Sequence, residues 1–241
     1  RAEKAPFYLK PIVSVEAKRL RNYEEKMFQY FEKKVIISQA DKEHLTHSNA
    51  TEIAVIPNGI DTGFFKSENR SKKTDILFTG NMGYLPNVES AQYLVKNILP
   101  ILNSDIAVQI CGKSPSYKVR SLAASNVEVT GWVDDIRTAY DEAKIFVAPL
   151  MLGSGLQNKL LEAMAMGLPC VTTPLANNAL GAIPEEEILI ASNEAEFKTQ
   201  IERLLSDTDL HRNIAEKGHA FVTKNYNWQA CNKRLMGVIE S

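Results

Sequence analysis

The chain has 241 residues, of which 44% are hydrophobic and 24% are charged, and its formal net charge is −1. At roughly 150 residues per domain, this length predicts one to two domains with a sizeable core. The near-zero charge excludes the basic surface of a general nucleic-acid binder, and no apolar run approaches the roughly 18 residues that a membrane-spanning helix needs. Three cysteines cannot make a closed disulfide framework, which indicates a reducing compartment such as the cytoplasm.

The first 34 residues are basic, with nine Lys or Arg against five Asp or Glu. Between residues 15 and 34, apolar residues recur at spacings of three and four, which predicts a helix with one apolar stripe. The stripe comprises Leu20, Tyr23, Met27, Phe28, Tyr30 and Phe31. Two interpretations are open: a partly buried helix with a solvated basic face, or a basic surface for an anionic partner or a membrane.

From residue 35 onward, short apolar runs alternate with amphipathic stretches. We expect strands at 35–38, 53–56, 75–80, 106–112, 127–131, 144–150, 168–173 and 187–191. Helices are expected at 87–102, 117–124, 134–142, 155–167, 194–205 and 207–225. Nearly continuous apolar strands that alternate with helices are typical of a parallel sheet covered on both faces. The sequence therefore predicts a doubly wound, Rossmann-like α/β domain from about residue 59 to residue 225.

Glycine residues follow four of these strands, at Gly80, Gly112, Gly131 and the pair Gly153 and Gly155. Glycine allows a ligand to approach backbone amides closely, although a glycine after a strand is commonly only a turn residue. Open α/β sheets bind ligands beyond the carboxyl ends of their strands, and all four positions lie at that edge. We therefore expect a ligand site along this edge of the sheet.

The segment GSGLQNKLLEAMAMG, residues 153–167, carries the strongest candidate site. If Gly153 to Gly155 open a helix, the unpaired amides of its first turn favour an anion such as a diphosphate. Lys159 and Glu162 share one helical face, where the lysine could reach a phosphate and the carboxylate could accept hydrogen bonds from sugar hydroxyls. From spacing alone, a solvated helical ion pair is an equal alternative. The chain has no dinucleotide-binding G-x-G-x-x-G after a strand and no P-loop motif.

At this segment the sequence resembles the C-terminal domain of GT-B fold glycosyltransferases of the large retaining family 4, also called glycosyl transferases group 1. The resembling blocks run in the family's order: VIPNGIDTGFF at 55–65, ILFTGNMGYLPNVESAQYL at 76–94, VQICG at 108–112, VEVTGWVDDI at 127–136 and IFVAPLMLGSGLQNKLLEAMAMGLPCVTT at 145–173. The resemblance covers most of residues 35–241. It implies a donor-binding domain for a nucleoside-diphosphate sugar, UDP- or GDP-linked, whose hexose-type sugar passes with retention to a glycan or lipid-linked acceptor in polysaccharide biosynthesis.

The resemblance also implies roles for individual residues. Glu162 matches the second glutamate of the family's E-x7-E motif and would hold the ribose, while Lys159 would contact the diphosphate; these two are the expected catalytic residues. Backbone amides at 153–156 would contact the donor phosphate and sugar, and the loops at 112–114 and 131–133 would frame the base. The full set of expected donor-binding residues is Gly80, Asn81, Gly112, Lys113, Gly131, Trp132, Val133, Gly153, Ser154, Gly155, Leu156, Lys159 and Glu162.

Two positions depart from the family pattern. The first glutamate of E-x7-E falls on Ser154, and the arginine often found after the first strand's glycine falls on Asn81. Both leave fewer charged groups for the donor, so the choice of donor is open. Two alternatives to a transferase are also open: a nucleotide-sugar epimerase of the same fold, and a non-catalytic nucleotide-sugar-binding subunit.

The domain organisation implied by the resemblance has three parts. Residues 1–57 would be the end of an N-terminal acceptor domain with the linker, 58–225 the nucleotide-sugar-binding domain, and 226–241 a crossover helix that packs toward the N-terminal part. The apolar stripe of that helix is Trp228, Cys231, Leu235 and Ile239. Most of the N-terminal domain, the natural packing partner, would then be missing, and the chain would bind its donor but be inactive alone. A cytoplasmic location is expected, either free or peripheral at the inner face of the membrane.

No complete set of metal ligands is visible in the sequence. The four histidines, His44, His47, His211 and His219, fall on helical stretches, and no cysteine or carboxylate set completes a site around them. The sequence therefore predicts metal-independent donor binding, with no cofactor besides the nucleotide-sugar substrate.

Overall fold

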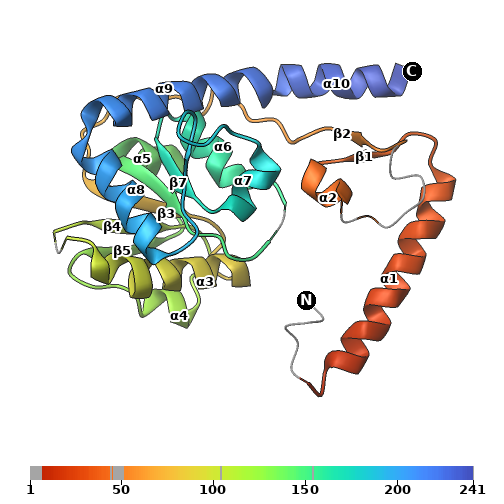
Figure 1. The fold of residues 1–241 in the computed structure, drawn as a ribbon, viewed down its shortest axis with the longest axis horizontal. Coiled ribbons are helices and arrows are strands. Elements are labelled where there is room, and N and C mark those ends of the chain that lie inside the picture. Colours follow the sequence, from red (N-terminus) through yellow and green to blue (C-terminus); the bar gives the residue numbers. More distant parts are fainter. Residues whose placement is uncertain (1–6, 44, 46–51, 104, 154, 241) are drawn as a thin grey trace.

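The computed structural model describes residues 7–43, 45, 52–103, 105–153 and 155–240. Figure 1 shows an α/β body, a long N-terminal helix that stands apart from it, and a small pair of strands between the two. The N-terminal helix is α1 (Lys10–Tyr30), and the pair consists of β1 (Val35–Ile36) and β2 (Ala54–Val55), with α2 (Gln39–Glu43) after β1. The candidate site lies in the α/β body.

Six parallel strands form the central sheet of this body, in the order β5-β4-β3-β6-β7-β8. They are β3 (Thr74–Thr79), β4 (Val108–Cys111), β5 (Val127–Gly131), β6 (Ala143–Ala148), β7 (Cys170–Thr172) and β8 (Leu189–Ile190). On the two central strands, consecutive residues such as Ile76 with Leu77 and Ile145 with Phe146 are all buried. Because a strand covered on both faces needs a continuous apolar run, the sequence pattern marked these positions. The predicted doubly wound parallel sheet is confirmed.

Helices cover both faces of the sheet (Figure 1). On one face lie α3 (Leu85–Tyr93), its π-helical continuation η2 (Leu94–Ile98), the 3-10 turn η3 (Leu99–Ile101), α4 (Tyr117–Arg120) and α8 (Glu194–Ser206). On the other face, α5 (Ile136–Glu142) and α6 (Asn158–Ala165) pack on β3, β6 and β7. Right-handed crossover connections place helices on the opposite face of the sheet where the strand order reverses. α9 (Thr208–Asn225) contacts both α6 and α8. The reversal falls between β3 and β6, where open α/β sheets form a ligand crevice.

The start of α6 differs from the sequence-based expectation. The helix begins at Asn158, its N-cap is Gln157, and the preceding glycine-rich segment is a loop. Gly153 has a φ of +94°, a left-handed conformation that an α-helix cannot contain. The prediction that Gly153 to Gly155 open the helix is therefore wrong, and the amides of the first helical turn begin at Asn158 instead.

Other helices also differ in extent. The helix expected at 87–102 begins at Leu85 and changes to π and 3-10 geometry after Tyr93, and the one expected at 117–124 ends at Arg120. α7 (Pro174–Leu180) was not predicted. Its ends carry ordinary helix signals: the Thr173 hydroxyl accepts a hydrogen bond from the Ala176 amide, and Gly181 closes the helix with a φ of +74°.

The apolar stripe of α1 is largely exposed. Of the residues predicted to form it, Met27 and Phe28 are half-buried, whereas Leu20 and Tyr23 are 58% and 59% exposed. The expected partial burial of this helix therefore holds only near its last turn.

The last helix, α10 (Trp228–Glu240), starts against the segment that leads into the α/β body. A Cβ atom on Gly59 would lie 2.6 Å from the Trp228 ring, and Ile60 pairs with Asn227 in a parallel bridge. Of the predicted stripe on α10, Cys231 is buried, while Trp228 and Ile239 are 47% and 57% exposed. In Figure 1, α10 continues the line of α9.

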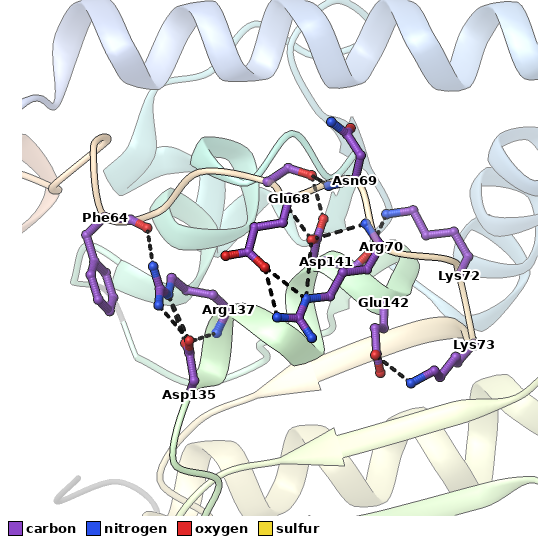
Figure 2. A network of polar contacts seen from close by, with 11 residues as sticks. Phe64, Glu68, Asn69, Arg70, Lys72, Lys73, Asp135, Arg137, Asp141 and Glu142 are labelled. Carbon is purple, nitrogen blue, oxygen red and sulfur yellow. Dashed lines mark hydrogen bonds and ion pairs between the residues drawn. The ribbon is translucent and has the colours of Figure 1, made fainter.

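The buried carboxylate of Asp141, on α5, accepts hydrogen bonds from the segment before β3 (Figure 2). Asp141 accepts hydrogen bonds from the Ser67 hydroxyl at 2.5 Å and from the backbone amides of Glu68 and Arg70 at 2.9 and 3.3 Å. Burial raises the pKa of Asp141, but these hydrogen bonds outweigh burial and hold the pKa below its ordinary value. The contacts fix the last turn of α5, whose neighbouring residue Tyr140 reaches the candidate site.

Candidate functional site

A pocket of about 510 Å³ opens at the carboxyl ends of β3, β4 and β5, beside the first turn of α6. It lies at the edge of the sheet where the sequence predicts a ligand site, next to the reversal of strand order between β3 and β6. The structure brings nine of the predicted donor-binding residues together there: Gly80, Asn81, Gly112, Lys113, Trp132, Val133, Leu156, Lys159 and Glu162.

Four predicted residues are not among those that line the pocket. Gly131, Gly153 and Gly155 lie outside its lining, and Ser154 lies outside the described residues. Gly131 has a backbone role next to the pocket, because its carbonyl accepts a hydrogen bond from the Gly112 amide at 2.9 Å. This hydrogen bond links the last residue of β5 to the residue after β4.

Two glycines allow the loops after β3 and β4 to meet at the pocket floor. A Cβ atom on Gly112 would lie 1.8 Å from the Gly80 carbonyl oxygen, and the φ of Gly112 is +142°. Any larger residue at Gly112 would push the two loops apart. The close approach therefore explains why glycine follows β4.

Lys159, in the first turn of α6, projects into this pocket. Its ammonium nitrogen donates a hydrogen bond to the Asn87 side-chain oxygen and lies 4.9 Å from the centre of the Phe78 ring. Burial lowers the pKa of Lys159 to about 8, and the negative charge of Glu162 opposes that decrease. The lysine is thus a half-buried cation that is mostly protonated at neutral pH.

Glu162 lies one turn further along α6 and is bonded to a different helix. Its Oε2 accepts a hydrogen bond from the Tyr140 hydroxyl at 2.7 Å, and the same hydroxyl lies 2.7 Å from the Thr79 hydroxyl. Burial raises the pKa of Glu162, while the Tyr140 hydrogen bond and the Lys159 charge lower it. The second carboxylate oxygen has no hydrogen bond within the described residues and is available to a ligand.

The surroundings of these two side chains decide between the interpretations that spacing left open. A more solvated helical pair exists elsewhere, on α8, where Lys198 and Glu202 form an ion pair with 40% and 45% of their side chains exposed. Lys159 and Glu162 are instead half-buried in one pocket, and each bonds to a separate helix. The solvated ion pair is therefore excluded for these two residues, and the structure places a cation and a carboxylate about one helical turn apart in the lining of the same pocket.

Trp132 lies at the mouth of the pocket with 70% of its surface exposed. It follows β5 directly, at a position where its ring could stack on a flat ring system such as a nucleobase.

Several pocket residues were missed by sequence reasoning, namely Thr79, Tyr84, Asn87, Cys111, Asp134, Ile136, Gln157 and Asn158. Tyr140, behind the pocket, was also missed. Asn87 and Tyr140 meet α6 from segments 72 and 22 residues away in the chain, a distance that no local pattern reports. For Asn87 a signal existed: Pro86 favours a helix start, which places Asn87 in the first turn after β3.

Neither a metal centre nor a membrane span is found in the described part of the chain. Within those residues, no group of three or more His, Cys, Asp or Glu side chains could hold a metal ion. Of the histidines considered as metal ligands, His44 and His47 lie outside the described residues, and the ring of His211 is hydrogen-bonded to the Lys144 carbonyl. The described helices include none that is long and apolar enough to cross a membrane.

The fold is shared with a glycosyltransferase from Rickettsia africae, which superposes with a TM-score of 0.76 at 17% identity, over 98% of this chain and 67% of that one. HepE from Anabaena, in complex with UDP and glucose, superposes with a TM-score of 0.78 at 15% identity, over 92% of this chain and 66% of HepE. Further structures of HepE hold UDP or UDP-glucose. At this identity the likeness concerns the fold alone.

Two curated bacterial proteins are related in sequence. An uncharacterized 44.6 kDa protein in the cps region of Klebsiella pneumoniae is 24% identical over 165 residues, which are 64% of this chain and 42% of that protein. An exopolysaccharide phosphotransferase of Streptomyces coelicolor is 26% identical over 202 residues, 79% of this chain and 21% of that protein. The chain thus spans less than half the length of each of these two relatives.

The family model described as "Glycosyl transferases group 1" matches residues 73–207, which are more than half of the chain. This range contains the central sheet, the pocket, and both Lys159 and Glu162. The chain belongs to the glycosyl transferases group 1 family.

Proposed function

We propose that the chain binds the sugar donor of a retaining glycosyltransferase, which moves a hexose-type sugar from a UDP- or GDP-linked donor to a glycan or lipid-linked acceptor. The observation that carries the proposal is the pairing of Lys159 and Glu162 in one half-buried pocket at the carboxyl edge of the sheet. Membership of the family and the UDP and UDP-glucose bound to HepE support it.

The pocket offers a partner for each part of such a donor. The Lys159 ammonium suits the diphosphate, whose negative charge grows as the bond from the anomeric carbon to its oxygen breaks. The free oxygen of the Glu162 carboxylate suits a ribose hydroxyl, which donates to it. Trp132 suits the base. The bond to the acceptor hydroxyl would then form on the same face of the sugar, with the acceptor bound outside this chain's pocket.

Binding of the donor is tested by thermal unfolding with UDP, GDP, ADP and TDP at millimolar concentration. A nucleotide present at 100 times its Kd stabilises the folded state by about 2.7 kcal/mol, which corresponds to an increase in Tm of roughly 5–10 °C for a chain of this size. We expect UDP or GDP to give such an increase. If none of the four nucleotides raises the Tm, the proposal is wrong.

Matched variants locate the effect in the pocket. Lys159→Ala and Glu162→Ala should remove the stabilisation by nucleotide. Lys198→Ala and Glu202→Ala change the ion pair on α8, another lysine and glutamate about one helical turn apart, and should keep the stabilisation. Equal responses of the two pairs of variants would contradict binding in this pocket.

The transfer reaction is tested in the protein that contains this chain, by release of UDP from a UDP-hexose with and without a glycan acceptor. Release that depends on the acceptor supports a transferase. Free UDP released from a UDP-hexose without an acceptor would favour an epimerase of the same fold, and binding without turnover would favour a non-catalytic subunit.

A further inference from the structure

Asn87 joins the two walls of the pocket. It lies in the first turn of α3 and is only 6% exposed, and both ends of its amide are hydrogen-bonded. Its Oδ1 accepts from the Lys159 ammonium, and its Nδ2 donates to the backbone carbonyl of Asn81 at 3.0 Å. The side chain therefore links α6, which carries the lysine, to the loop after β3.

The chemistry of its two partners fixes the orientation of this amide. An ammonium group is only a donor and a backbone carbonyl is only an acceptor, so the oxygen must face Lys159 and the nitrogen must face Asn81. Aspartate has nearly the same shape but no hydrogen to give to the Asn81 carbonyl. It would also place a negative charge directly on the lysine. Only a neutral amide meets both requirements at once.

The loop after β3 is shaped around the same side chain. A Cβ atom on Gly80 would lie 2.7 Å from Asn87 Nδ2 and 3.2 Å from Lys159 Nζ. Glycine at residue 80 thus leaves the space in which the amide and the ammonium meet. Three segments, the β3–α3 loop, α3 and α6, converge on this one contact.

We infer that Asn87 is a positioning residue, which holds the Lys159 ammonium in the pocket without neutralising its charge, so that the charge stays available to an anionic ligand. The inference rests on the proposed function in that the ligand is taken to be the diphosphate of a nucleotide sugar. The inference gives a role to Asn87 in the segment PNV, residues 86–88 at the start of α3. The family resemblance implies no role for this residue.

The groups around Lys159 leave the amide as its direct polar partner. On α6, Glu162 acts on the lysine through its charge, but its carboxylate bonds to Tyr140 on α5. On β3, Phe78 offers only its ring face. Lys113, Asp134 and the buried thiol of Cys111 also line the pocket, and within the described residues none of these three side chains bonds to the ammonium. Replacing the amide should therefore change the charge state of the lysine directly.

The first measurement is the titration of Lys159 followed by NMR of the labelled lysine side chain, in the chain without nucleotide. Asn87→Asp should raise the measured pKa by one or more, because an adjacent opposite charge has about that effect. Asn87→Ala should lower it or leave it low, because the ammonium loses its acceptor. Asn126→Asp is the matched control: Asn126 also donates from its amide to a backbone carbonyl, that of Ile106, at the opposite edge of the sheet.

The second measurement is the affinity for UDP by calorimetry with the same three variants. Both Asn87 variants should bind UDP about tenfold more weakly, as expected when a hydrogen bond to a charged group is lost. Asn126→Asp should bind as the unchanged chain does. A merely structural defect would weaken binding without raising the pKa of Lys159 in Asn87→Asp.

The outcomes separate the inference from the proposed function. If the pKa of Lys159 is the same in Asn87→Asp as in the unchanged chain, or if both Asn87 variants bind UDP within twofold of it, the inference is wrong. If the pKa responds as expected but the unchanged chain does not bind UDP, the positioning role stands and the proposed ligand is wrong.

Discussion

The low pKa of Lys159 makes nucleotide binding depend on pH in a way that can be calculated. Burial lowers that pKa to about 8 in the free chain. A bound diphosphate places negative charge beside the ammonium and raises the pKa again, so binding takes up a proton wherever the free lysine is partly neutral. The affinity for UDP should therefore be nearly constant below pH 7 to 8 and decrease above it.

The size of the decrease follows from the fraction of protonated lysine. With a pKa of about 8, this fraction falls from about nine-tenths at pH 7 to about one-tenth at pH 9. If only the protonated chain binds the diphosphate well, the affinity should decrease about tenfold over this range. At pH 8, each UDP bound should take up about half a proton.

Calorimetry in two buffers with different ionisation enthalpies measures both quantities at once. The secondary ionisation of a phosphate group has a pKa of about 6, so the diphosphate keeps its charge over this range. Burial also raises the pKa of the Cys111 thiol in the pocket, which keeps it protonated over most of the range. Lys159→Ala is the control, since its weaker affinity should show only the titration of the nucleotide itself. If the unchanged chain and this variant have the same pH dependence, Lys159 does not contact the diphosphate.

Three further predictions concern the residues around the site. Asp141→Asn should lower the free energy of unfolding by about 2–3 kcal/mol in urea titrations at pH 7, because it weakens three hydrogen bonds to this buried side chain. Since the pKa of Asp141 is lowered in the folded chain, the carboxylate contributes its full stabilisation above the unfolded-state pKa near 4, and this stabilisation is lost as the pH decreases below it. A variant as stable as the unchanged chain would refute the role of Asp141. Tyr140→Phe should lower the free energy of unfolding by about 1–2 kcal/mol and raise the pKa of Glu162 further in an NMR titration. An unchanged pKa of Glu162 would mean that the Tyr140 hydroxyl does not stabilise the carboxylate. Trp132→Ala should weaken UDP binding at least about fivefold by loss of stacking and leave the urea midpoint unchanged, and equal affinity would exclude stacking on this ring.

Much of the fold could be predicted because buried parallel strands require continuous apolar runs. The runs that end at Thr79, Cys111 and Ala148 became central strands, and the glycines after them marked the edge that binds ligands. The start of α6 was predicted wrongly because apolar spacing continues into the loop before it, while the left-handed Gly153 that ends any helix there has no signature in the apolar pattern.

The partners of the site residues could not be predicted in the same way. Lys159 and Glu162 stand out by their spacing on one helix, but spacing does not tell a solvated pair from a buried one. Whether the pair is solvated or buried depends on Asn87 and Tyr140, which reach Lys159 and Glu162 from α3 and α5 only once the sheet has formed. Such contacts depend on the strand order, which brings segments far apart in the chain to the same edge.

A crystal structure of the chain with UDP would show directly whether the pocket holds the donor. We predict that the diphosphate lies within hydrogen-bond distance of Lys159 Nζ, that a ribose hydroxyl donates to Glu162, and that the base lies against Trp132. UDP bound elsewhere on the chain, or bound in this pocket with the diphosphate away from Lys159, would contradict it.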